Sequence, residues 1–405
     1  MITWPTEVLF RLLQISLWPW LRWRFRIHRR VEPGLRRSRS PVVVVANHVN
    51  FWDPFLVTLA LGVPLFFVAA DGNFRSRSSR VAMRLAGAIP KAKARDDRAS
   101  LRTMQELVRR GKSVALFPEG QRTWDGRSRP LLPGSAKLLR LLRAPVVVVQ
   151  LRGAYRSTPR WTPTLRRGRL EVHISSLACP SELRSAPLST LTERLETALA
   201  FDEDSWQATT GQLFVAPRRA EGLEQVLFQC YHCGAWDHIE TAGDYIACRC
   251  CGSRWWYGPS GALYPRRVPL PDRWSPITVA DWQNRQLPAL AAALQFPAPG
   301  NSPQPGPLPY FCPGVQLFTG YRTRPLTPHG VVECRLTRRE LVVGTPPATT
   351  VPIAEIQGLN VQYAAQLEFY WRRRLYVLRF HRSSASAYRV EQTIKRLQEI
   401  TLQDH

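Results

Sequence analysis

Two residues that could move a proton stand close together near the start of the chain. His48 and Asp53 lie within the sequence NHVNFWDP, directly after the apolar run Val42 to Val45. A neutral imidazole can act as a general base, and a carboxylate bound to one ring nitrogen leaves the other nitrogen facing a substrate. A helix beginning just after the run would place the two side chains about one and a half turns apart. The pair predicts a base with an orienting carboxylate, and the alternative is a histidine that caps or packs at the end of a strand.

A second polar motif follows another short apolar run, Ser113 to Leu116, about seventy residues later. Its sequence is Phe117-Pro118-Glu119-Gly120-Gln121-Arg122-Thr123. Together, N-H-x4-D and F-P-E-G-x-R-[ST] at this separation resemble the glycerolipid acyltransferase family, and above all the 1-acylglycerol-3-phosphate acyltransferases. The resemblance covers roughly residues 40 to 200.

The resemblance implies a reaction and a set of roles. His48 would remove the proton from an acceptor hydroxyl, and Asp53 would fix the tautomer of the imidazole. The acceptor oxygen would then attack an acyl thioester of coenzyme A or of an acyl carrier protein, without a catalytic cofactor. A phosphorylated acceptor such as a lysophospholipid would meet Asn47, Glu119, Gly120, Arg122, Lys91 and Lys93. A surface ion pair is the alternative role for Arg122.

Several positions depart from the family pattern. Asn50 stands where a serine is usual, and Gln121 stands where a threonine is usual. After Gly87 to Pro90 the family tends to place an arginine, and here Lys91, Lys93 and Arg95 are available. The usual Phe-Lys-x-Gly is replaced by Leu131 to Gly134. These differences affect the identity of the acceptor and leave the reaction type unchanged.

The segments around the two motifs predict an α/β domain over residues 35–202. Val42 to Val45 are four consecutive β-branched residues, as in a strand buried on both faces of a parallel sheet. Short apolar runs alternate with helical periodicity, which favours a mixed, mostly parallel sheet flanked by helices. The expected strands are 42–45, 64–70, 87–90, 114–117, 145–151 and an edge strand at 170–174, and the expected helices are 76–86, 99–110, 134–143 and 188–199. The polar stretch 202–211 suggests that the domain ends there.

Four cysteines predict a metal site in the second half of the chain. Cys230-x2-Cys233 and Cys248-x2-Cys251 have the spacing of a zinc ribbon, which we expect over residues 223–258. Four thiolates complete a tetrahedral sphere, so the zinc would be structural. Cys250 is an alternative to Cys248, and His232 and His238 are weaker candidates. The eight cysteines do not form a disulfide framework, which fits a reducing compartment.

The first 34 residues combine tryptophans with arginines. Trp18, Trp20 and Trp23 alternate with three arginines, as in a helix that lies at the headgroup level of a bilayer. Pro19 is expected to break this segment, and its apolar run is too short to span a membrane. The formal net charge of +26 predicts a polyanionic partner. We expect anionic membrane lipid rather than nucleic acid, and a peripheral position on the cytoplasmic face. The alternative is a helix that packs on the enzyme domain, and both can hold together.

The remainder of the chain is predicted in two parts. Residues 259–307 should hold a helix opening at Ser275-Pro276, bent or broken at Pro288, and then a Pro/Gly-rich linker. Residues 308–405 alternate in the manner of strands and end in an amphipathic helix from Ala387 to Leu402. This order resembles a small barrel of the pleckstrin-homology or GRAM type.

Three functions fit these patterns. The first is acyl transfer to the free hydroxyl of a lysophospholipid in phospholipid biosynthesis or remodelling. The second is acyl transfer to another hydroxyl or amine, as in the formation of an ornithine-type lipid. The third is a scaffold that binds membrane lipid without catalysis, and the presence of His48, Asp53, Glu119 and Arg122 argues against it.

Overall fold

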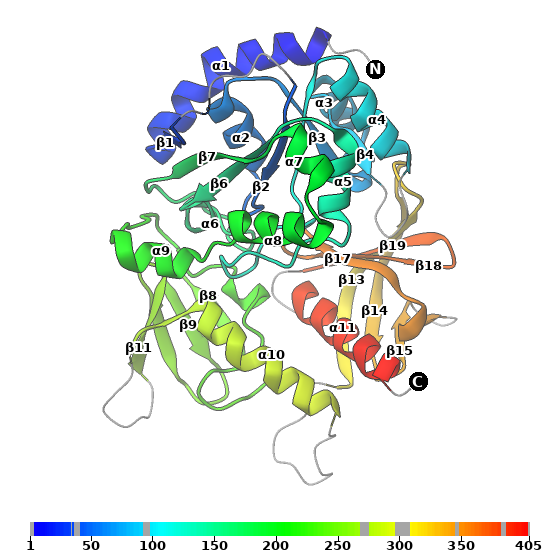
Figure 1. Cartoon of the computed structure of the whole chain (residues 1–405). Coiled ribbons are helices and arrows are strands. Elements are labelled where there is room, and N and C mark those ends of the chain that lie inside the picture. Colours follow the sequence, from blue (N-terminus) through cyan, green and yellow to red (C-terminus); the bar gives the residue numbers. More distant parts are fainter. Residues whose placement is uncertain are drawn as a thin grey trace. The chain divides into compact units, whose positions relative to one another are not determined.

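The computed structural model describes residues 4–33, 35, 41–91, 98–267, 275–295, 308–344, 348–381 and 386–403. The chain forms two compact units (Figure 1). The N-terminal unit comprises Met1–Arg160 and Leu165–Val215, and the C-terminal unit comprises Trp161–Thr164 and Ala216–His405. Lys93 and most of the expected Pro/Gly-rich linker lie outside the described residues.

The N-terminal unit is built on a seven-stranded sheet in the order β1-β7-β6-β2-β5-β3-β4. Strands β6, β2, β5, β3 and β4 are parallel, and β7 runs antiparallel to β6. The strands are β1 His28–Val31, β2 Val43–Ala46, β3 Leu65–Ala70, β4 Ile89–Lys91, β5 Ser113–Leu116, β6 Val146–Arg152 and β7 Glu171–Ala178. The helices are α1 Trp4–Phe25, α2 Asp53–Leu61, α3 Arg77–Leu85, α4 Arg98–Arg109, α5 Ser135–Leu142, α6 Ala154–Ser157, α7 Pro180–Ser185, α8 Leu188–Leu199 and α9 Glu203–Thr210.

Strand β2 is buried on both faces, as its run of valines predicts. Val44 belongs to a core cluster with Leu21 and Phe25 of α1, whereas Val43 belongs to a second cluster with Leu195 of α8. Successive side chains of a strand point to opposite faces, so one apolar run supplies both cores. In Figure 1, α1 and α8 accordingly lie on opposite sides of the strands. The predicted mixed, mostly parallel sheet flanked by helices is confirmed.

Three local expectations were wrong. Helix α1 continues through Pro19 instead of breaking there. The strand expected at an edge, β7, pairs on both sides, because His28–Val31 forms an additional strand parallel to it. The polar stretch after Phe201 forms α9, because the Asp202 carboxylate accepts hydrogen bonds from the first backbone N–H groups of that helix. Helix α9 belongs to the N-terminal unit.

The C-terminal unit contains two antiparallel sheets. The first has five strands in the order β12-β11-β10-β9-β8, and the second has seven in the order β16-β15-β14-β13-β19-β18-β17. Their bounds are β8 Ile239–Ala242, β9 Tyr245–Cys248, β10 Arg254–Tyr257, β11 Ala262–Arg267, β12 Ile277–Thr278, β13 Tyr310–Gly320, β14 Thr327–Leu336, β15 Glu340–Val343, β16 Thr349–Pro352, β17 Gln357–Gln362, β18 Gln366–Trp371 and β19 Arg374–Phe380. The curled second sheet and α11 Ala387–Gln403 form the predicted β-rich region with its final helix.

Helix α10 spans Val279–Gln295 and continues through Pro288, where a bend or break was expected. Trp282 on this helix packs against Trp255 of β10 with ring centroids 4.9 Å apart, and both side chains are fully buried. This contact places Trp255, close to the cysteine motifs in sequence, in the core of the C-terminal unit. Among the helices of the described residues, none combines the length and apolar character needed to cross a bilayer.

Candidate functional site

The parallel topology brings both sequence motifs to one edge of the N-terminal sheet. Val45 of β2 pairs with Leu116 of β5, so the loops after these strands leave the sheet side by side. His48 lies in the first loop and Glu119 in the second. The carboxyl ends of parallel strands meet at a common edge, which is where ligands bind in open α/β sheets. Two motifs about seventy residues apart thus contribute to a single site.

His48 and Asp53 form a hydrogen-bonded pair. The distance between His48 Nδ1 and Asp53 Oδ2 is 2.8 Å. Asp53 is the first residue of α2, and its Oδ2 also accepts the backbone N–H groups of Val49 at 2.6 Å and Asn50 at 2.9 Å. His48 itself lies in the turn before the helix, and not on the helix as the spacing had suggested. The turn wraps around a fully buried carboxylate, which holds Nδ1 and leaves Nε2 to face a substrate.

The surroundings of His48 favour the neutral imidazole. Its ring stacks on Phe117, with centroids 4.2 Å apart and planes 13° apart. Burial lowers the pKa of His48 below its usual 6.5; the hydrogen bond and charge of Asp53 oppose this shift, and the guanidinium groups of Arg122 and Arg160 add to it. The side chain keeps 22% of its accessible surface. The imidazole is therefore an unprotonated base at neutral pH that a substrate can still reach.

Glu119 joins the two loops. Its Oε1 accepts the backbone N–H of His48 at 3.2 Å, and its Oε2 accepts that of Arg129 at 3.1 Å. Burial raises the pKa of Glu119 to about 7, although the two backbone hydrogen bonds act in the opposite direction. Both carboxylate oxygens thus have partners within the protein. In this geometry Glu119 positions the His48 loop.

Gly120 is required by the turn that follows Pro118. Its φ of +70° lies in the left-handed region, and an added Cβ would approach the side chain of Leu132 to 2.8 Å. Its N–H donates to the carbonyl of Phe117 at 3.0 Å and closes the turn. A side chain here would be strained by both the backbone and its neighbour.

Two asparagines connect the His48 loop to strand β6 and helix α6 through hydrogen bonds. Asn47 Nδ2 donates to the Leu151 carbonyl at 2.9 Å, and its Oδ1 accepts the Leu151 N–H at 2.7 Å. Asn50 Nδ2 donates to the carbonyl of Ala154 at 2.7 Å. Asn47 was predicted to contact substrate, but its amide is buried and its hydrogen bonds go to the backbone. Asn50, which the sequence marked only as a departure from the family pattern, has a similar positioning role.

Two arginines supply positive charge next to His48. Arg122 belongs to the second motif. Arg160 follows helix α6 and is the last residue of the stretch Met1–Arg160 of the N-terminal unit. Both lower the pKa of His48. Arg160 Nη1 donates to the Arg122 carbonyl at 3.0 Å, and its guanidinium lies 3.7 Å from the centroid of the Trp124 ring. Sequence reasoning selected Arg122 and missed Arg160. No motif marks Arg160, because only the fold brings it to this edge.

The two predicted lysines have different outcomes. Lys91 is exposed at the carboxyl end of β4, beside Ala70 of β3. This strand lies at the far end of the sheet, two strands beyond β5. Lys91 therefore shares the carboxyl edge of the sheet with His48 but lies on its outermost strand. Lys93 is outside the described residues.

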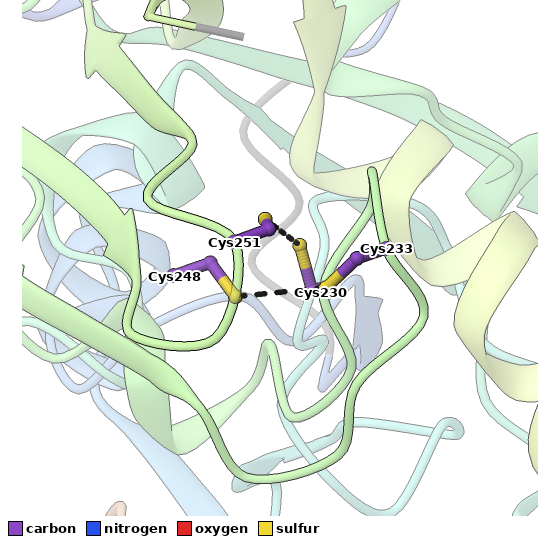
Figure 2. A group of neighbouring side chains, drawn as sticks. All are labelled: Cys230, Cys233, Cys248 and Cys251. Carbon is purple, nitrogen blue, oxygen red and sulfur yellow. Dashed lines mark hydrogen bonds between the residues drawn. The ribbon is translucent and has the colours of Figure 1, made fainter. Parts of the chain in front are cut away.

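The four predicted cysteine ligands converge in the C-terminal unit. Their sulfur atoms all lie within 4.8 Å of one another. Figure 2 shows the four side chains gathered at one place between two loops. The Cys230–Cys251 and Cys233–Cys248 sulfur pairs are each 3.8 Å apart. Zinc–sulfur bonds of about 2.3 Å in a tetrahedron require sulfur atoms about 3.8 Å apart, whereas a disulfide requires about 2.05 Å. The donor set therefore fits a closed tetrahedral zinc site.

The local backbone explains how the cysteines are presented. Gly234 and Gly252 follow the two CxxC motifs, and both have a left-handed φ, +74° and +71°. In each turn the glycine N–H donates to the carbonyl of the first cysteine. Two equivalent knuckles thus face each other. Cys250 is exposed and is not part of the cluster found among the described residues, and neither are His232 and His238.

Comparisons with known proteins agree with the motifs of the N-terminal unit. Residues 26–152 match the family model named Acyltransferase. A chloroplastic 1-acyl-sn-glycerol-3-phosphate acyltransferase of Brassica napus is 35% identical over 129 residues, which cover 31% of this chain and 37% of that protein. A second chloroplastic enzyme of the same name, from Arabidopsis thaliana, is 31% identical over 148 residues, covering 36% of this chain and 40% of that protein.

The chain spans well under two thirds of the length of these curated relatives. Among solved structures, the 1-acyl-sn-glycerophosphate acyltransferase PlsC of Thermotoga maritima aligns with a TM-score of 0.40 and 20% identity. That alignment covers 47% of this chain and 76% of the solved chain.

Proposed function

We propose that this chain, whose residues 26–152 form a domain of the acyltransferase family, transfers an acyl group from a thioester to the hydroxyl of a lysophospholipid. The observation that carries the proposal is the 2.8 Å hydrogen bond between His48 Nδ1 and the buried Asp53 carboxylate. It lies at the carboxyl edge of the parallel strands, where a substrate can reach the ring. The relatives named above, 1-acyl-sn-glycerol-3-phosphate acyltransferases, favour a phosphorylated acceptor.

In the proposed reaction His48 Nε2 takes the proton of the acceptor hydroxyl. The oxygen attacks the carbonyl carbon of the thioester, the carbon–sulfur bond breaks, and the thiolate leaves with the proton that His48 has received. Asp53 stabilises the imidazolium that forms between these two transfers. The stack on Phe117 and the hydrogen bonds from Glu119 and Asn47 to the adjoining backbone hold the loop, so the proton acceptor is positioned before substrate arrives.

The acceptor phosphate is proposed to bind at Arg122, with Arg160 next to it. Both guanidinium groups act on His48 electrostatically, so an anion placed there would lie within reach of the reacting hydroxyl. Arginine suits this role because its planar fork can bind phosphate through two parallel hydrogen bonds. The acyl donor is proposed to be a thioester of coenzyme A or of an acyl carrier protein.

We also propose that α1 attaches the enzyme peripherally to an anionic membrane surface. One side of this helix is packed in the core, because Leu21 and Phe25 are fully buried. The other side exposes Leu12 by 59%, Ile15 by 78% and Trp23 by 63%. Arg11, Arg22 and Arg26 are exposed beside these apolar side chains. Buried apolar area and arginines near lipid phosphates would act together at the bilayer interface.

The four cysteines are proposed to hold one structural zinc. With four thiolate ligands the ion has no open position for a substrate, so its contribution is to the stability of the C-terminal unit.

The test of the catalytic proposal is thioester consumption by the purified full chain with a panel of lysophospholipids and of acceptors without phosphate. We expect release of free thiol that depends on a phosphorylated acceptor, and an acylated product of the corresponding mass. Turnover with an amine or a phosphate-free hydroxyl alone would support the alternative acceptor class. Absence of product with every acceptor and both donor types would contradict an enzymatic role.

Membrane attachment is tested with Ile15→Glu, which places a charge on the exposed side of α1. We expect it to lose most binding to vesicles containing anionic lipid while its melting temperature stays unchanged. Leu213→Glu is the matched control, since Leu213 is 55% exposed elsewhere in the same unit. Equal sedimentation of both variants with vesicles would show that α1 is not the attachment surface. Removal of the whole helix is a poor test, because it would also remove Leu21 and Phe25 from the core.

A further inference from the structure

The N-terminal unit has a second concave site, built from residues that the proposed reaction does not use. It is an open groove of about 830 Å³ between strands β1, β6 and β7 and helices α8 and α9. Gln150 on its floor donates to the carbonyls of Ala198 and Ala200, so the groove lies on the α8 side of the sheet. The ring of Phe117, on which His48 stacks, packs against the core cluster of the other side. A volume in this range suits a small organic ligand.

Two side chains that line one wall of the groove, those of Arg30 and His173, contact a single carboxylate next to the groove. Glu171, only 4% exposed, lies 2.8 Å from Arg169, 3.9 Å from Arg30 and 3.0 Å from His173. Burial by itself raises the pKa of Glu171, but His173, Arg30 and Arg169 together lower it below its usual value. Glu171 is therefore ionised. Its single negative charge is smaller than the combined positive charge of Arg30 and Arg169 beside it.

Arg152 adds further positive charge on the same wall. It is cross-strand to Glu171, its Nε donates to Gln150 at 2.8 Å, and its guanidinium lies 5.7 Å from the centroid of the Phe201 ring. Burial lowers the pKa of Arg152; Glu171 opposes this shift, and Arg30 adds to it. The guanidinium groups of Arg30 and Arg152 thus repel each other along this wall.

Two acids also line the groove, and both are held by backbone N–H groups. Glu32 accepts the N–H of Ser176 at 2.8 Å. Asp202 caps α9 by accepting the N–H groups of Asp204 and Ser205. Both acids lie outside the strands, and among the described lining residues on β1, β6 and β7 the side chains with a formal charge are Arg30 and Arg152.

The opposite wall contains an apolar stretch next to the polar side chains of Thr197, Asp202, Ser205 and Thr209. The apolar stretch is formed by Ala198 and Ala200 at the end of α8, by Phe201, and by Trp206 of α9. The rings of Phe201 and Trp206 lie 6.4 Å apart. A ligand that spans the groove would meet guanidinium groups at one end and aromatic rings at the other.

We propose that this groove binds a phosphomonoester whose organic part is apolar. The phosphate would lie between Arg30 and Arg152, where two guanidinium forks can donate to it and where it would relieve their mutual repulsion. The organic part would cover Phe201 and Trp206, with favourable burial of apolar surface. Such a group can come from a small soluble molecule or from a lipid headgroup with the start of its chains. The proposal does not depend on acyl transfer.

The experiment is calorimetric titration of the full chain with phenyl phosphate and, separately, with inorganic phosphate at low ionic strength. The variant Arg30→Gln/Arg152→Gln removes both charges and keeps side chains of similar length. Arg109→Gln/Arg110→Gln is the matched control, since these arginines are exposed at the C-terminal end of α4 and pair with Glu106. Circular dichroism establishes that both variants are folded. None of the four arginines belongs to the proposed catalytic machinery.

We expect the wild type and the control variant to bind phenyl phosphate more tightly than inorganic phosphate. The groove variant should bind it at least tenfold more weakly, and Phe201→Leu should reduce the preference for the phenyl ester. Flotation of the wild type and the groove variant with vesicles of phosphatidic acid distinguishes a lipid source from a soluble one, because α1 is the same in both proteins. Weaker flotation of the groove variant indicates the lipid source, and equal flotation indicates the soluble one. No saturable binding by the wild type, or equal affinity of the wild type and the groove variant, would overturn the proposal. Such an outcome would leave thioester consumption by the enzyme unaffected.

Discussion

The His48 site and the cysteine cluster are each formed by two short motifs, but they leave their reactive atoms in different states. At the first site a single oxygen of Asp53, Oδ2, contacts one ring nitrogen and two backbone N–H groups, and the imidazole keeps an exposed edge. At the second, four sulfurs face one another, and none is directed at a substrate position. The exposed ring nitrogen of His48 can take a proton from a substrate. Four thiolates around one metal ion leave no position for a substrate, so they can only bind the metal. Chemistry and metal-dependent stability should therefore be separable in this chain.

The largest expected effect is that of His48→Ala. Loss of a general base typically lowers the rate on the order of 10² to 10⁴-fold, and we expect thioester consumption to fall within this range. Unfolding should be little changed, because the ring is partly exposed. His28→Ala, at an exposed histidine of β1, serves as the control. Normal turnover by His48→Ala would exclude His48 from the reaction.

Asp53→Asn should have the next largest effect. An amide in place of the carboxylate can donate to Nδ1, which would move the ring proton to Nε2 and remove the base. We expect a loss of about 10²-fold or more in kcat with a smaller change in KM. Thermal unfolding measures the loss of stability that follows from weaker hydrogen bonds to the N–H groups of Val49 and Asn50. A change confined to KM would show that Asp53 serves binding and not the tautomer of His48.

Removal of the metal should lower the stability of the C-terminal unit and leave the transfer activity nearly unchanged. Purified protein is expected to contain about one zinc per chain. Chelation should expose the backbone amides around residues 225–258 to hydrogen exchange, with transfer activity changed by less than about twofold. Cys233→Ser should abolish zinc binding, and Cys250→Ser, at the exposed cysteine outside the cluster, should not. Metal-free protein after purification without a chelator would refute the zinc assignment.

A smaller effect is expected at the turn that connects Glu119 to Arg122. Gly120→Ala should destabilise the N-terminal unit by about 1 to 2 kcal/mol, because alanine at positive φ is strained. Gly111→Ala is a matched control with a φ of +76° and no neighbouring atom within 4 Å. The difference in melting temperature between the two variants measures the contact with Leu132. Equal losses would show that the backbone conformation alone requires glycine.

Features that are local in sequence could be predicted here, and features assembled from distant segments could not. The valine run of β2, the His48–Asp53 pair and the two CxxC knuckles each occupy a few consecutive residues, so their spacing is informative. Arg160, the groove residues Arg30 and Arg152, and Glu171 next to them come from separate elements and carry no motif. Pro19 and Pro288 are tolerated within helices whose other residues are held by buried contacts, which propensity alone does not include.

For some residues the sequence predicted the position correctly but not the role. Asn47 and Glu119 both lie at the His48 edge, as expected, but their polar atoms bind backbone groups and position the loop. A motif reveals that a residue is needed, and the hydrogen-bond partners decide whether it meets the substrate or supports a residue that does.

The most direct test of the account is the pH dependence of kcat/KM for thioester consumption. Burial lowers the pKa of His48 below 6.5, so the base is neutral at pH 7 and gains a proton only as the pH falls through that lower value. We predict a constant rate from about pH 7 upward and a single-proton decline on the acid side below pH 6.5. A decline centred near pH 7 would instead identify Glu119, whose pKa is raised to about 7, as the titrating group. That result would contradict catalysis by a neutral His48.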